Sequence, residues 1–196
     1  MDFWFEFAST YSYPAAMRVG RLAQAAGVHL RWRPFLLGPI FAAQGWGDSP
    51  FNLNPAKGAY MWRDLARICA REDVALALPP LRFPQNGLKA ARIALAAEGE
   101  DWMPDFVRAV YTANFAERKD IADDDVLADM LARVGTDPAA AVAAANTPEN
   151  KARLRTQNEE AVARGVFGAP SVIAGGEMFW GNDRLEEAIA WAARNP

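Results

Sequence analysis

The first residues of the chain alternate between phenylalanine and other side chains, which predicts a β-strand over residues 2–7. Ser12 stands where a helix N-cap belongs and Pro14 falls in the first helical turn, and apolar residues then recur at helical spacing as far as Gly27. A second alternating stretch, 28–33, predicts another strand that ends at Pro34. A strand, a helix and a strand joined by short links predict a parallel βαβ unit. The two faces of the first strand carry Phe3, Phe5 and Phe7 on one side and Asp2, Trp4 and Glu6 on the other.

Between about residues 36 and 147 the pattern changes to alanine-rich helix. Loops rich in proline, glycine and asparagine separate the helical segments at 45–55, 79–87 and 135–138. We therefore predict a helical subdomain over residues 38–147, inserted into an α/β unit. Its three apolar stripes are Met61, Leu65, Ile68 and Cys69; Trp102, Phe106, Ala109, Val110 and Ala113; and Val126, Leu127, Met130, Leu131 and Val134.

The last fifty residues return to mixed helix and strand. Thr147 followed by Pro148 predicts the start of a helix that runs to about residue 164. Strands are expected at 170–174 and 177–180, joined by a hairpin turn at Gly175 and Gly176. Asn182 or Asp183 is expected to cap a final helix. The order βαβ, helical insert, αββα predicts a thioredoxin-like α/β fold with an inserted all-helical subdomain, the thioredoxin-like domain comprising residues 1–37 and 148–196.

Composition narrows the functional classes. The chain has 196 residues, 52% of them hydrophobic, and a net charge of −3, which argues against a nucleic-acid partner. No apolar run approaches the ~20 residues needed to span a membrane, and the N-terminus lacks the features of a secretion signal. The lone Cys69 cannot form an internal disulfide, which fits a cytoplasmic protein. No spacing of histidine, cysteine and aspartate suggests a metal site.

The turn after the first strand is the leading candidate for chemistry. A thioredoxin-like redox site has a Cys-x-x-Cys motif there, but this chain has Ser9 and Ser12, which excludes dithiol chemistry. A serine at a helix N-terminus can donate a hydrogen bond to a thiolate and lower the pKa of that thiol. Because the chain has no thiol at this place, we expect a thiol cofactor.

A second candidate segment lies near the C-terminus. Pro170 follows Phe-Gly-Ala, which predicts a cis peptide bond that exposes the main chain of Ala169 to an extended peptide. Asn182 and Asp183 are suited to hold the ammonium and carboxylate groups of a γ-glutamyl residue. The tripeptide thiol glutathione fits this set of groups.

Several stretches of the sequence are specific to one group of proteins. FWFEFASTYSY, RPFLLGPIF, PAKGAYMWRDLAR, FPQNGLKAAR and GVFGAPSVIAGGEMFWGNDRL are spread over almost the whole chain. The sequence resembles the 2-hydroxychromene-2-carboxylate isomerases and the kappa-class glutathione transferases, both relatives of DsbA. RPFLLGPIF, FPQNGLKAAR and WGNDRL make the isomerase branch the closer one. The resemblance also implies a homodimer.

The resemblance implies roles for particular residues. Ser9 would hydrogen-bond the glutathione sulfur, the main chain of Ala169 would bind the cysteinyl part, and Lys57 a carboxylate. Asn86, Tyr11 and Trp46 are the candidates for the substrate pocket, together with Phe51 and Trp62. The implied glutathione site comprises Ser9, Lys57, Ala169, Pro170, Trp180, Asn182 and Asp183.

The implied activity is a glutathione-dependent cis-trans isomerisation. The thiolate adds to a conjugated substrate, a bond rotates, and elimination returns glutathione. Two departures from the family pattern are visible: the common S-P-Y-S is Ser9-Thr10-Tyr11-Ser12, and loop 45–52 does not align with a glutathione-contacting asparagine of the transferases. The alternatives are a kappa-like transferase or peroxidase acting on other electrophiles, and a redox-inactive thioredoxin-like module that binds peptides.

Overall fold

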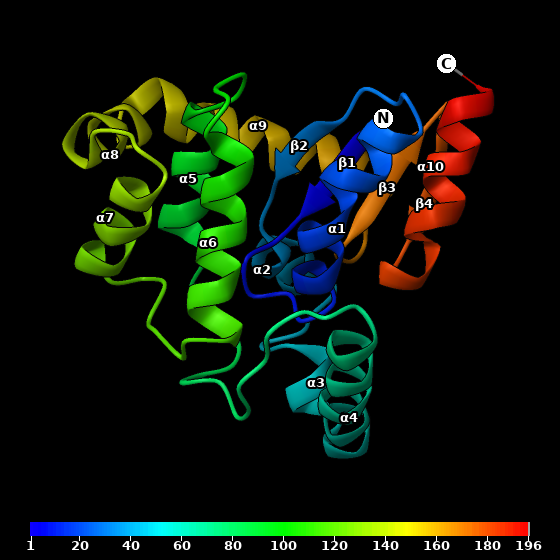
Figure 1. The fold of residues 1–196 in the computed structure, drawn as a ribbon. Coiled ribbons are helices and arrows are strands. Elements are labelled where there is room, and N and C mark those ends of the chain that lie inside the picture. The colour runs from blue at the N-terminus through cyan, green and yellow to red at the C-terminus, as the bar shows by residue number, and fades with distance from the viewer. Residues whose placement is uncertain (196) are drawn as a thin grey trace.

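A mixed sheet of four strands forms the centre of the computed structural model, which describes residues 1–195 (Figure 1). The strands are β1 (Asp2–Phe5), β2 (Arg31–Pro34), β3 (Ser171–Ala174) and β4 (Glu177–Trp180), and their order in the sheet is β2-β1-β3-β4. The strands β1 and β2 are parallel, as the βαβ prediction requires, and β3 and β4 form the expected antiparallel hairpin. The prediction that the second strand begins at Val28 is wrong, because the pairing with β1 begins at Arg31.

Both faces of β1 are buried, because a separate apolar cluster packs against each of them. Phe3 and Phe5 pack edge-to-face against Trp32 in the main core. On the opposite face, Trp4 packs against Phe35 in a second apolar cluster. The side of the strand that looked partly polar in the sequence is therefore also covered.

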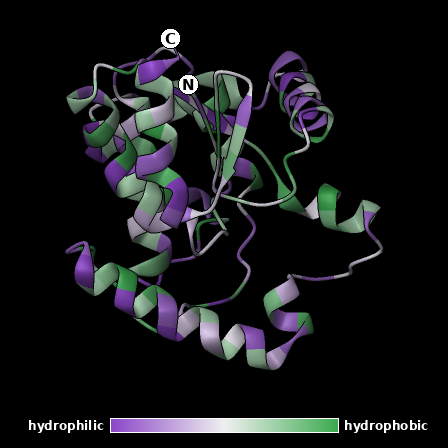
Figure 2. Ribbon diagram, turned by 90° about the vertical axis from the view of Figure 1, so that its right-hand side faces the viewer, coloured by the Kyte–Doolittle hydropathy of each residue, from purple (hydrophilic) through white to green (hydrophobic). Residues whose placement is uncertain are grey.

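Helices pack around the sheet, and further helices extend the molecule beyond it (Figure 1). The helix α1 (Ser12–Ala25) links β1 to β2, α9 (Pro148–Ala163) precedes β3, and α10 (Leu185–Arg194) ends the described chain after the short 3-10 helix η1 (Asn182–Arg184). Most helices carry both hydrophilic and hydrophobic residues, as expected where one side faces the core and the other faces solvent (Figure 2). Between β2 and α9 lie α2 (Leu37–Ala43), α3 (Pro50–Leu53), α4 (Pro55–Arg71), α5 (Leu88–Ala96), α6 (Met103–Phe115), α7 (Asp124–Arg133) and α8 (Pro138–Ala145).

Six of these seven intervening helices form two groups. The helices α5, α6, α7 and α8 gather on one side of the molecule, whereas α3 and α4 lie below the sheet in the view of Figure 1. The predicted apolar stripes are confirmed as core-facing, since Leu65 in α4, Phe106 in α6 and Leu131 in α7 are fully buried. The boundaries 38–147 of the helical subdomain stay a prediction. No helix among residues 1–195 is both long and apolar enough to cross a bilayer.

Helix capping differs from the sequence prediction at two of three places. Thr147 caps α9 as predicted, its hydroxyl accepting a hydrogen bond from the Asn150 N–H at 3.2 Å. Ser12 does not cap α1, because it is itself the first helical residue, and the hydroxyl of Ser9 accepts from its N–H at 3.3 Å. Neither Asn182 nor Asp183 caps α10 with its side chain, because both residues belong to η1.

Candidate functional site

The two sequence segments singled out above meet in space. Because β1 pairs with β3, with Trp4 opposite Ser171, the turn after β1 lies beside the loop before β3. The hydroxyl of Ser9 donates a hydrogen bond to the main-chain oxygen of Ala169 at 2.9 Å. The peptide bond between Ala169 and Pro170 is cis, as predicted. Ser9 therefore joins the N-terminus of α1 to the proline loop.

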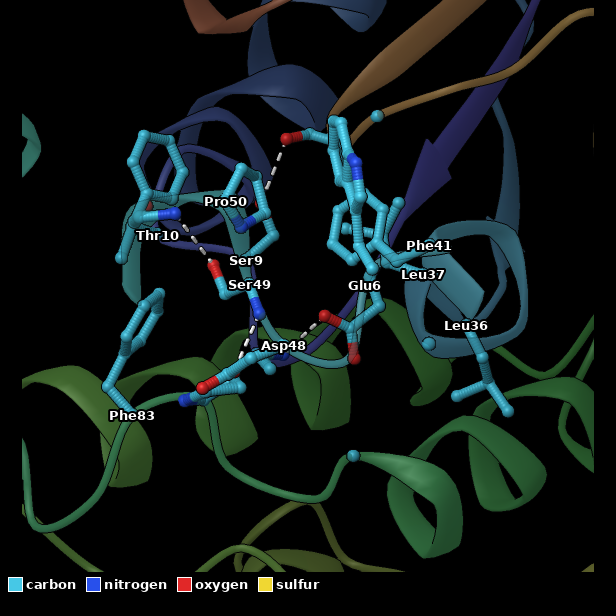
Figure 3. A pocket seen from close by; sticks show the side chains of 18 of the residues that line it. Glu6, Ser9, Thr10, Leu36, Leu37, Phe41, Asp48, Ser49, Pro50 and Phe83 are labelled. Atoms are coloured by element: carbon cyan, nitrogen blue, oxygen red, sulfur yellow. Dashed lines mark hydrogen bonds between the residues drawn. The ribbon is translucent and has the colours of Figure 1, made fainter. Parts of the chain in front are cut away.

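A cavity of about 730 Å³ opens at this contact, within the usual range for small-molecule sites (Figure 3). Its wall comes from the turn after β1, from α2, from loop 44–51, from the start of α4, from residues 83–88 and from the loop before β3. Most of these side chains are apolar, Leu36, Leu37 and Phe41 among them. The predicted site residues that the cavity brings together are Ser9, Tyr11, Trp46, Lys57, Asn86, Ala169 and Trp180.

Three other predicted residues lie just outside the cavity wall. Pro170 is buried behind Ala169. Asn182 is only 3% exposed, and its amide oxygen accepts a hydrogen bond from the Arg18 guanidinium at 3.0 Å. Asp183 is exposed, and its charge helps to raise the pKa of Tyr11, which places it close to the cavity. Trp62, expected beside the substrate, packs instead against Phe83.

Arg18 is a structural centre that the sequence reasoning did not identify. Its guanidinium lies on α1, is nearly buried, and forms ion pairs with Glu72 at 3.1 Å and Glu186 at 2.5 Å. With the bond to Asn182 it thus ties α1 to the end of α4, to η1 and to α10. A helical arginine on a mixed face gives no signal in the sequence, because its three partners are distant along the chain.

Tyr11 and Lys57 occupy the side of the cavity nearest α4. The Tyr11 hydroxyl donates to Asp64 at 3.0 Å, and burial followed by the Asp64 carboxylate raises the pKa of this phenol, which therefore stays protonated. Its ring lies 6.1 Å from that of Phe51. The ammonium of Lys57 sits 5.5 Å from the Phe51 ring, and the side chain is exposed. Lys57 thus places an exposed cation in the wall of the cavity.

Glu6 is a further titratable residue in the wall, and the sequence analysis did not select it. Its side chain is 7% exposed, and one carboxylate oxygen accepts from the Ala8 N–H at 3.0 Å. Burial raises the pKa of this carboxyl to about 7, opposed by the hydrogen bond from the main-chain N–H of Ala8. Among the described residues, no group of three or more histidine, cysteine, aspartate and glutamate side chains is arranged to hold a metal ion.

Comparison with known proteins defines the class to which this fold and site belong. Residues 1–189 match the family model of the DSBA-like thioredoxin domain. A 2-hydroxychromene-2-carboxylate isomerase of Sphingobium xenophagum is 33% identical over 187 residues, covering 95% of this chain and 94% of the relative. Human glutathione S-transferase kappa 1 is 23% identical and covers 95% of this chain and 87% of its own length.

The structural comparison agrees with the sequence comparison. The solved structure of a 2-hydroxychromene-2-carboxylate isomerase superposes with a TM-score of 0.87 and 27% identity, covering 98% of this chain and 94% of that one. The chain therefore belongs to the 2-hydroxychromene-2-carboxylate isomerase family within the DsbA-like thioredoxin class, and it is an isomerase enzyme.

Proposed function

We propose that this enzyme is a glutathione-dependent cis-trans isomerase of 2-hydroxychromene-2-carboxylate or a similar conjugated aromatic-pyruvate compound. The observation that carries the proposal is the contact between Ser9 and Ala169 at the edge of a largely apolar cavity. The names of the isomerase relatives support the substrate class, and that of the kappa transferase supports glutathione. The proposal includes the homodimer and the cytoplasmic location that the family resemblance implies, and light scattering on the purified protein tests the former.

The groups around Ser9 fit a tripeptide thiol. The N–H of Ala169 has no hydrogen-bond partner among the described residues, and its carbonyl contacts only the Ser9 hydroxyl, so both are suited to pair with an extended peptide. Lys57 supplies a cation for a carboxylate, and Asp183 supplies an anion for an ammonium. Asn182 would contribute only its amide nitrogen or main chain, because Arg18 holds its oxygen.

The residues of this chain would prepare the site for reaction. When bound, glutathione supplies a thiolate that adds reversibly to a conjugated alkene carbon, which permits rotation. Ser9 would turn its hydroxyl from Ala169 to the sulfur, where the N-terminus of α1 also favours negative charge. The apolar wall around Phe41 and Trp46 would exclude water and hold a flat substrate.

Calorimetric titration with glutathione tests the proposal directly. The wild-type protein should bind glutathione, and Ser9→Ala should retain binding while losing the thiolate absorbance of the bound cofactor. Asp183→Ala should weaken binding at least tenfold, whereas Glu187→Gln, an exposed carboxylate in the first turn of α10, should not. Absence of binding at millimolar glutathione would reject the proposal and leave the peptide-binding module.

A second activity deserves a test because the kappa transferase also matches this chain. An isomerase returns glutathione after every turnover, whereas a transferase or peroxidase consumes it. Measuring total free thiol during conversion of a chromene carboxylate distinguishes the two. Constant thiol supports isomerisation, and a fall in proportion to product supports transfer to an electrophile.

A further inference from the structure

A carboxyl group without a cation is built into the wall of the cavity. Glu6 lies three residues before Ser9 in the turn after β1, and the Ser9 N–H donates to the Glu6 main-chain oxygen at 3.0 Å. In Figure 3 the carboxyl group of Glu6 lies among the side chains that line the cavity. Proteins rarely bury a carboxylate without a partner, because an isolated charge is costly in an apolar environment.

The position of this carboxyl group is fixed from several sides. The Tyr111 hydroxyl, from α6, donates to the Glu6 main-chain oxygen at 2.8 Å, and the Asn114 amide donates to the Phe7 oxygen at 3.1 Å. Gly87, at the start of α5, closes the wall over the carboxyl group. A Cβ at that position would lie 3.1 Å from the second Glu6 carboxylate oxygen and 2.9 Å from the Phe7 Cβ. Gly87 therefore allows the close approach of α5 to Glu6.

The described side chains around Glu6 supply no cation that pairs with its carboxylate. The other titratable groups that line the same cavity are Tyr11, Asp48, Lys57 and Tyr60, and the Tyr111 hydroxyl contacts the main chain of Glu6 from α6. Burial raises the pKa of Glu6 to about 7. Glu6 therefore gains and loses its proton near neutral pH, where a proton acceptor for a thiol is most effective.

We propose that Glu6 accepts the proton of the cofactor thiol when that thiol binds beside Ser9, an inference that rests on the glutathione dependence proposed above. The S–H bond breaks, its proton forms an O–H bond with the Glu6 carboxylate, and the electron pair stays on sulfur. The sulfur then faces the Ser9 hydroxyl and the N-terminus of α1. The Glu6 and thiol pair carries one negative charge before and after the step.

Charge balance is the physical reason for this transfer. A thiolate and a carboxylate together would place two like charges in one poorly solvated site, which raises the pKa of one of them. A carboxylic acid beside a thiolate avoids that repulsion, and a hydrogen bond from the Ser9 hydroxyl favours the charge on sulfur. The two groups therefore titrate as a coupled pair that keeps one proton across the neutral range.

The number of protons released when glutathione binds tests the inference without any activity measurement. Calorimetry in buffers of different ionisation enthalpy gives this number, and S-methylglutathione, which has no thiol, corrects for the rest of the ligand. With a reference thiol pKa of about 8.5 and the Glu6 pKa of about 7, wild type should release about 0.9 proton at pH 6 and close to none at pH 8. Glu6→Gln should release about 1 proton at pH 6 and about 0.8 at pH 8.

Asp48, in the wall of the same cavity, supplies the control variant. Asp48→Asn removes the other carboxylate of the wall and should keep the wild-type pH dependence. Equal release by wild type and Glu6→Gln at pH 8 would overturn the inference while leaving glutathione binding intact. Failure of wild type to bind glutathione would overturn the proposed function as well. If Glu6→Gln does not fold, the wild-type numbers alone decide, since a release that stays at about 0.8 proton at pH 8 overturns the inference.

Discussion

Replacing glycine by alanine should change the stability of the protein in opposite directions at two helical positions with different surroundings. A Cβ on Gly58, buried in α4, would lie 2.3 Å from the main-chain oxygen of Phe51 in α3. A Cβ on Gly20, inside α1, would meet only the tip of the Arg108 side chain at 3.7 Å, an ordinary contact. Gly58→Ala is therefore the perturbation and Gly20→Ala is its matched control.

The magnitudes follow from opposing effects. Replacing glycine by alanine inside a helix stabilises it by about 1 kcal/mol. At Gly20 nothing opposes this gain. At Gly58 both clashing atoms belong to the backbone, so no side-chain rotation relieves the overlap, and α3 must move at a cost of about 2–3 kcal/mol. Gly58→Ala should therefore be less stable than wild type by about 1–2 kcal/mol, and Gly20→Ala more stable by up to about 1 kcal/mol.

Urea unfolding and thermal melts measure these effects, with about 2–4 °C in Tm for each kcal/mol in a chain of this size. Gly58→Ala should also weaken ligand binding, because Phe51 contacts the Tyr11 ring and the Lys57 ammonium at the cavity. If Gly58→Ala raised the free energy of unfolding as Gly20→Ala does, the close approach of α3 and α4 would not constrain position 58. The reasoning would then be wrong.

Other parts of the structure give further predictions. The pKa of Glu6 is about 7 in the folded protein and about 4.5 when unfolded, so folding binds a proton, and its contribution to stability should fall by up to about 3 kcal/mol as pH rises from 4.5 to 7. In Glu6→Gln this fall in the free energy of unfolding should be absent, and urea titrations of wild type and variant at several pH values measure it. If stability falls with pH equally in both proteins, the prediction is wrong. Arg18→Met should destabilise the protein by about 2–4 kcal/mol in urea, because it leaves the buried Asn182 oxygen without its donor and removes the ion pairs with Glu72 and Glu186. A loss under 0.5 kcal/mol would show that the network contributes little. Burial raises the pKa of Cys69 to about 11, so a disulfide reagent should label native protein only at its unfolding rate, and rapid labelling would show that the thiol is accessible.

Local patterns in the sequence predicted the elements well, but not the boundaries where tertiary contacts decide. The hairpin was predictable because Gly175 and Gly176 both adopt positive φ, which glycine favours. Ser12 was assigned as the cap of α1 because of its spacing from Pro14. The tight turn after β1 instead brings Ser9 to the first helical N–H, which a residue count does not reveal.

The candidate site could be predicted in part, and the missed residues share one cause. Ser9 and Ala169 were found from local patterns, namely the serine at a helix start and the proline loop, whereas Trp180 was found from the family resemblance, and the structure brings all three to one cavity. Glu6 was missed because the alternation over residues 2–7 marks it only as one member of a strand face. The strand β1 ends at Phe5, and Gly87 from a distant segment covers the Glu6 carboxyl group, which only the folded structure shows, as it does for the partners of Arg18.

The position of β1 between β2 and β3 has a consequence for synthesis on the ribosome. The strand β2 follows within about thirty residues, but β3 begins at Ser171, near the end of the chain. Until that segment emerges, one edge of a strand composed largely of phenylalanine and tryptophan has no neighbour, and such edges promote aggregation. The nascent chain thus has an unpaired strand edge from the synthesis of β1 until that of β3, and the segment that pairs with this edge also places Ala169 beside Ser9.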